Sequence, residues 1–62
     1  MKTATIIVHE VFGTNGRTIA ANVFYRGKRL WHVMENETAQ NLLNRARAWA
    51  YDNGFSHVRL EV

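Results

Sequence analysis

Cationic and aromatic side chains gather in one short stretch, Tyr25-Arg26-Gly27-Lys28-Arg29-Leu30-Trp31-His32. Arginine and lysine contact phosphates, and an aromatic ring stacks on a nucleic-acid base. This stretch therefore indicates a binding site, and its candidate residues are Arg26, Lys28, Arg29, Trp31 and His32. A solvated hairpin tip flanked by core aromatic residues produces the same pattern, so both interpretations stay open.

Metal chemistry is not indicated by the sequence. His9, His32 and His57 are far apart and lack the local spacing of metal ligands. The chain has no cysteine, which excludes disulfides and thiolate metal sites. We therefore expect no metal and no cofactor.

Catalytic chemistry is equally poorly represented. Ser56 is the only serine, and its neighbour His57 points to the opposite face of a strand. The five carboxylates show no spacing typical of a catalytic pair, and no glycine-rich phosphate loop is present. The sequence thus predicts a binding protein without catalytic residues rather than an enzyme.

Length and composition set the broad class. The 62 residues predict one domain, residues 1–62, and the net charge of +3 favours acidic partners or phosphates. No apolar run approaches the roughly 20 residues of a membrane span, and the first ten residues are too short and too polar for a signal peptide. We expect a soluble cytoplasmic protein, complete as given, with no membrane partner.

The clearest element is an amphipathic helix over Glu37 to Asp52, with Asn36 as its N-cap and Asn53-Gly54 as its stop. Its apolar positions recur at the spacing of a single helical stripe. They are Ala39, Leu42, Leu43, Ala46, Trp49 and Ala50.

Four strands surround this helix in the sequence. They are predicted over Thr5 to Phe12, Arg17 to Arg26, Arg29 to Met34 and Phe55 to Val62, with turns at Gly13 to Arg17 and at Arg26 to Lys28. The order β-β-β-α-β predicts an α+β fold: a small antiparallel or mixed four-stranded sheet with one helix packed on one face. A right-handed crossover places the last strand parallel to the first, in the spatial order fourth, first, second, third.

Alternation in the second strand places Ile19, Ala21, Val23 and Tyr25 toward the helix and Phe24 away from it. The first strand has two registers. A two-residue Asn15-Gly16 loop pairs Phe12 with Ile19 and places Ile6 and Val8 in the core, whereas a three-residue loop places Ile7 and Val11 there.

The third strand has the same ambiguity. Bulk favours Trp31 and Val33 inside, which leaves Leu30, His32 and Met34 exposed. In every register some apolar side chains remain with Phe24 on the uncovered face, and a contiguous patch of this kind on a small monomer indicates a partner or self-association.

Two resemblances to phage proteins follow from these residues. The stretch from Glu37-Thr38 through Trp49, Tyr51 and Gly54-Phe55 to Val58-Arg59 resembles the helix and last strand of the phage T7 inhibitor of bacterial RNA polymerase. That family binds the polymerase through charged strand residues, and the resemblance assigns such a role to Arg59.

The region from Arg17 to Tyr51 is similar to the three-stranded arm-site DNA-binding domains of phage integrases, which also carry a Gly-Lys-Arg hairpin before a helix. The fourth strand predicted after the helix departs from that pattern. The resemblance implies contact with DNA.

The sequence therefore predicts a small phage- or mobile-element-type protein that binds a host protein or protein–nucleic-acid complex and modulates it, as an inhibitor does. The alternatives are a DNA- or RNA-binding module that uses the basic-aromatic hairpin, and a homodimer that buries its open sheet faces. The binding residues predicted for these functions are Phe24, Arg26, Lys28, Arg29, Trp31, His32 and Arg59.

Overall fold

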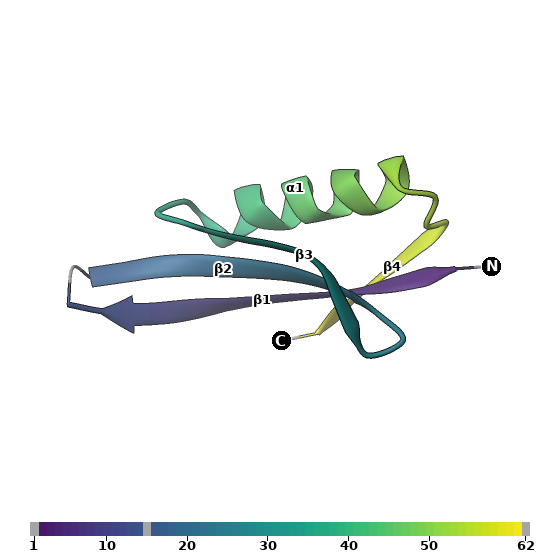
Figure 1. Ribbon diagram of the computed structural model, residues 1–62. Helices are drawn as coiled ribbons and strands as arrows, with labels where there is room; N and C mark the ends of the chain where they lie inside the picture. Colours follow the sequence, from purple (N-terminus) through teal and green to yellow (C-terminus); the bar gives the residue numbers. More distant parts are fainter. Residues whose placement is uncertain (1, 15, 62) are drawn as a thin grey trace.

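The computed structural model describes residues 2–14 and 16–61, which form one mixed sheet and one helix (Figure 1). The elements are β1 (Thr3–Gly13), β2 (Gly16–Tyr25), β3 (Lys28–Glu35), α1 (Ala39–Asp52) and β4 (His57–Glu61). The sheet order is β3-β2-β1-β4. The predicted α+β class, element order and strand order are confirmed.

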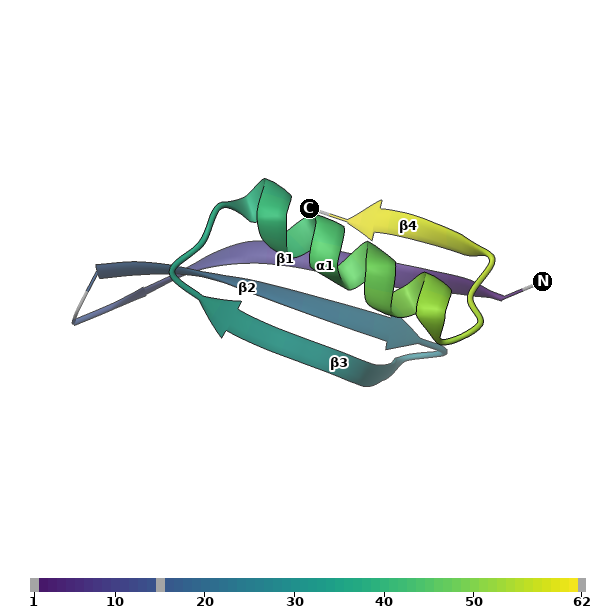
Figure 2. The ribbon, with the colours of Figure 1, turned by 90° about the horizontal axis from the view of Figure 1, so that it is seen from above.

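The strand directions also agree with the prediction. β1 is antiparallel to β2 and β2 is antiparallel to β3, whereas β4 returns parallel to β1. The connection from β3 to β4 contains α1, which lies diagonally across one face of the sheet (Figure 2). A parallel return needs such a crossover, so the position of α1 on the sheet follows from the strand order.

The helix begins two residues later than predicted, and Asn36 is not its N-cap. Thr38 has extended backbone angles, and its hydroxyl oxygen accepts a hydrogen bond from the backbone N–H of Asn41 at 3.1 Å. Threonine is a favoured N-cap because this bond satisfies one of the free N–H groups of the first turn. Glu37 therefore precedes the helix, where its carboxylate accepts from the side-chain amide of Asn41.

The core lies between α1 and one face of the sheet. Leu42, Ala46 and Ala50 form the buried stripe of the helix, as predicted, and Ile6 and Val23 are fully buried beneath them. Aromatic rings close the end of the core near the C-terminus of α1. Their contacts are Tyr25 with Phe55 at 5.1 Å between ring centroids and Trp31 stacked on Trp49 at 6.3 Å.

The side chains of β1 point to the predicted faces of the sheet, but β1 pairs with β2 in a different register from the predicted one. Ile6 and Val8 face the helix, as the two-residue loop predicts, but Phe12 pairs with Arg17 instead of Ile19. The two registers differ by two residues, so they direct the same side chains to the same face. The turn residue Asn15 lies outside the described residues.

The turn between β2 and β3 is followed by a β-bulge that decides which side chains enter the core. Arg26 and Gly27 have φ angles of 53° and 79°, which is typical of a type I′ two-residue hairpin turn. Lys28 therefore belongs to β3. The pairing then shifts, because Phe24 pairs with Arg29 but Val23 pairs with Trp31.

Leu30 is thus an extra residue in β3. It reverses the alternation of every residue after it. In a regular strand Leu30 would pair with Val23 and face the helix, whereas the bulge gives that place to Trp31. The prediction that Trp31 and Val33 face inward, with Leu30, His32 and Met34 exposed, is confirmed.

Candidate functional site

The sheet surface opposite α1 is called the open face here, because no element of the described residues covers it (Figure 1). Strand pairing and alternation define its members. They are Thr3, Thr5, Ile7, His9 and Val11 of β1, Thr18, Ala20, Asn22 and Phe24 of β2, Arg29, His32 and Met34 of β3, and His57, Arg59 and Glu61 of β4. The predicted position of Phe24 away from the helix is confirmed.

One row of paired residues crosses all four strands, and we name it the cation row. Arg29 pairs with Phe24, Phe24 with Thr5, and Thr5 with Arg59. Three strand spacings of roughly 4.8 Å place the backbones of Arg29 and Arg59 about 14 Å apart. The half-buried Phe24 therefore lies between the strand positions of the two arginines in this row.

The neighbouring row, the amide row, contains His32, Asn22, Ile7 and Glu61 in order across the sheet. Asn22 is only 5% exposed and is the one buried polar residue of the described part of the chain. Its Oδ1 atom lies 2.7 Å from Nδ1 of His32 and accepts from Arg29 Nη1 at 3.5 Å. The hydrogen bond from Arg29 to Asn22 therefore joins the two rows.

Charge is distributed unequally between the two faces. Of the five carboxylates, only Glu61 belongs to the open face. On the other face Glu10 pairs with Arg17 at 3.2 Å and Glu35 pairs with Arg45 at 2.8 Å.

The hydrogen bond that Arg45 donates to the Glu35 carboxylate raises the pKa of Arg45. By contrast, Arg29 and Arg59 form no ion pair within residues 2–14 and 16–61. The open face therefore presents two arginines that form no ion pair with an acidic side chain of the described residues.

All three histidines lie on the open face, but in different rows. His9 pairs with Ala20, His32 with Asn22, and His57 with Thr3. Among the described residues, no group of three or more histidine, aspartate or glutamate side chains could hold a metal ion.

The structure separates the predicted binding residues into three groups. Phe24, Arg29, His32 and Arg59 lie together on the open face. Arg26 and Lys28 lie at the hairpin turn, where the guanidinium of Arg26 is 5.4 Å from the centroid of the Tyr25 ring.

The third group is Trp31 alone, which faces the helix and stacks on Trp49. It is therefore not available beside the open-face arginines. Phe24 is the ring that occupies that position. Asn22 is not among the binding residues predicted from the sequence. One feature of the sequence could have indicated it: Asn22 is the only amide in the apolar run Ile19 to Phe24.

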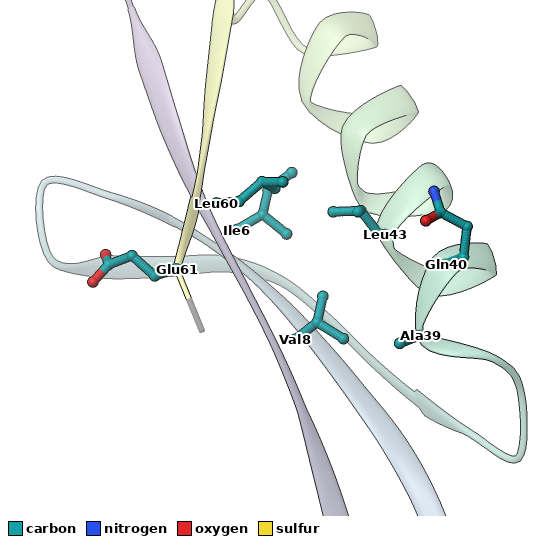
Figure 3. A pocket seen from close by; sticks show the side chains of 7 residues that line it. All are labelled: Ile6, Val8, Ala39, Gln40, Leu43, Leu60 and Glu61. Atoms are coloured by element: carbon teal, nitrogen blue, oxygen red, sulfur yellow. The ribbon is translucent and has the colours of Figure 1, made fainter.

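Two hollows border the helix side of the described residues and offer little chemistry. One of about 160 Å³ lies between β1, β4 and the first turns of α1 (Figure 3). It is lined by Ile6, Val8, Ala39, Gln40, Leu43, Leu60 and Glu61. The carboxylate of Glu61 points away from the other lining side chains in Figure 3. A neighbouring hollow of about 430 Å³ borders Val8, His9, Glu10, Ile19 and Ala39.

Neither lining contains a serine, threonine or lysine that could act as a nucleophile. The open face is therefore the stronger candidate site.

The chain matches no protein-family description, no curated protein and no solved structure. Within the described residues, no helix has the length and apolar character needed to cross a membrane.

Proposed function

We propose that the protein is a nucleic-acid-binding module that works through its open face. The observation that carries this proposal is the cation row, in which Arg29 and Arg59 flank Phe24 on a surface with one carboxylate. Guanidinium groups bind phosphate oxygens in bidentate fashion. An aromatic ring between them offers a stacking platform to a base.

Two further features support a polyanionic ligand. The net charge of the chain is +3, and the carboxylates Glu10 and Glu35 are held in ion pairs away from the open face. Hydroxyl and imidazole groups surround the arginines, and side chains of these types contribute further contacts to phosphate and sugar. Those nearest to the cation row are Thr3, Thr5, His32 and His57.

A second candidate is the function that the sequence predicted first, binding of a host protein or protein–nucleic-acid complex by a phage- or mobile-element-type inhibitor. The observation in its favour is apolar exposure on β3, which is an edge strand of the sheet. Met34 is 50% exposed and Leu30 is 39% exposed. An exposed strand edge with apolar side chains can accept a strand from a partner.

The direct test measures binding of labelled 12-nucleotide strands and duplexes by fluorescence anisotropy between 50 and 300 mM salt. The double variant Arg29→Ala/Arg59→Ala removes two phosphate contacts, so the log–log salt slope should fall by about 0.7 per contact on a single strand. Arg47→Ala is the matched control, because it removes one cation from α1 on the other side of the sheet.

The proposal is wrong if the unaltered protein binds neither ligand at 50 mM salt. It is also wrong if Arg47→Ala weakens binding as much as the open-face variants do. Capture of a stoichiometric protein partner that survives nuclease treatment would instead favour the second candidate. A dimer whose formation blocks the open face would favour the predicted homodimer.

A further inference from the structure

We infer that the nucleic acid is single-stranded, and that Asn22 and His32 read the edge of a base that stacks on Phe24. This inference rests on the proposed function and adds to it a class of strand and two specificity-determining side chains. It follows from the bulge in β3, from the hydrogen bonds of Asn22, and from the position of Phe24 beside them.

The bulge brings together two side chains that a regular strand would separate. Arg29 and His32 are three residues apart, so in a regular strand they would point to opposite faces of the sheet. The extra residue Leu30 places both on the open face, where both reach the same oxygen of Asn22. Bulges commonly re-aim side chains beside functional sites.

The hydrogen bonds fix the orientation of the Asn22 amide. Guanidinium nitrogens only donate, so the Asn22 atom that contacts Arg29 must be the carbonyl oxygen. That oxygen carries no hydrogen, so Nδ1 of His32, 2.7 Å away, must be the donor. Neutral His32 therefore keeps its lone pair on Nε2, which becomes a hydrogen-bond acceptor.

The amide nitrogen of Asn22 supplies the complementary donor. It makes no hydrogen bond within the described part of the chain. No buried side-chain nitrogen or oxygen there lacks a partner, so this nitrogen must reach the surface. A residue that is 5% exposed thus presents one donor group at the centre of the open face.

Phe24 lies two residues from Asn22 on the same face, a separation of about 7 Å along the strand. A base stacked on Phe24 would hold its edge toward the Asn22 donor and the His32 acceptor. Bases inside a duplex are stacked on each other and are not available to such a ring, whereas single strands offer unstacked bases. The arrangement therefore selects a single strand and discriminates between bases.

The test compares the Kd values of four 12-nucleotide homopolymers, as DNA and as RNA, and of one mixed-sequence duplex. Asn22→Asp keeps the oxygen that accepts from Arg29 and His32 but removes the donor. In this variant, the ratio of the Kd values of the weakest-binding and the tightest-binding homopolymer should change by about fivefold or more. Arg59→Ala is the control, because a lost phosphate contact should weaken all homopolymers by a similar factor.

A second variant changes the exposed partner of Asn22 and leaves the buried amide in place. His32 is exposed, so His32→Ala should leave the fold intact and should also change the order of base preference. Comparison of the DNA and RNA homopolymers shows which sugar the protein prefers, and a preference for either single strand supports the inference.

The inference is overturned if both variants keep the original ratio while Arg59→Ala loses affinity, an outcome that leaves the proposed function standing. Tighter binding of the duplex than of every single strand also overturns it. Absence of binding to any of these ligands overturns the proposed function itself.

Discussion

The two faces of this sheet are built from the same strands but differ in burial and in charge. On the helix side, Ile6, Val23 and Leu42 are fully buried, and the carboxylates at the rim are held in ion pairs. On the open face, Phe24 lies beside the buried amide of Asn22, and the two arginines form no ion pair within the described residues. Alternating residues of one strand therefore supply both the core and the candidate site.

The comparison is clearest in β2, which lies between β1 and β3 in the sheet. Its residues Ala21 and Val23 are sealed beneath α1, whereas Asn22 and Phe24 lie on the other side. Burial of apolar surface is the main stabilising term in a small domain. Stability should therefore be sensitive to changes on the helix side, and binding should be sensitive to changes on the open face.

Trp31→Ala should have the largest effect, because the bulge places Trp31 opposite Val23 on the helix side of the sheet. The variant would lose the stacking of Trp31 on Trp49. Loss of a large aromatic side chain from a core costs about 3–5 kcal/mol. That is comparable to the whole stability expected for 62 residues, roughly 3–9 kcal/mol.

Urea denaturation followed by circular dichroism and tryptophan fluorescence measures this change. The matched control is Leu30→Ala, which truncates the exposed neighbouring residue and should retain most of the stability. A Trp31→Ala variant with unchanged stability would show that Trp31 does not pack in the core in solution.

The next largest loss of stability should distinguish two adjacent isoleucines of β1 that point to opposite faces of the sheet. Ile6→Ala opens a cavity beneath α1 and should cost about 2–5 kcal/mol. Ile7→Ala removes the same atoms from a half-buried position and should cost less than half as much. Equal losses in urea denaturation would mean that the open face is covered in solution.

Loss of the helix cap should have a smaller effect that is confined to stability. Thr38→Ala removes the hydroxyl that accepts from Asn41 and should cost about 1 kcal/mol. Asn36→Ala, at the position that the sequence suggested for the cap, should have little effect. If the two variants lose the same stability in thermal denaturation, Thr38 is not the cap in solution.

These positions also show how far the sequence determines the structure. The stripe of α1 and the facing of β2 follow from periodicity, because each needs only one element to be recognised. The inward orientation of Trp31 follows only from its bulk, since no sequence pattern in Arg29-Leu30-Trp31 indicates a β-bulge. The sequence also does not distinguish Thr38 from Asn36 as the N-cap, because both residue types cap helices well.

Part of the candidate site could be predicted in the same way. Phe24 follows from alternation alone, and the basic-aromatic stretch points to Arg29 and His32. The bonds of Asn22 to these two residues could not be predicted, since they depend on the strand register and on the bulge. The sequence predicts Trp31 both to face inward and to belong to the binding residues, and the structure confirms the first prediction, because Trp31 stacks on Trp49 in the core.

Substitution of the open-face arginines should have the smallest effect on stability and a clear effect on binding. Arg29 and Arg59 are exposed and form no ion pair in the described residues, so each change to alanine should alter stability by less than about 0.5 kcal/mol. Anisotropy measurements on the same samples should show weaker nucleic-acid binding. A loss of stability that accompanies the loss of binding would mean that these arginines have a structural role.

The most direct test of the central claim is a titration of the ¹⁵N-labelled protein with a single-stranded 12-mer, followed by amide chemical shifts. The account predicts that the largest shifts fall at Thr5, Asn22, Phe24, His32 and Arg59, with Ala46 and Ala50 on the helix unchanged. Shifts that cluster on α1 instead, or an unchanged spectrum at saturating strand, would contradict it.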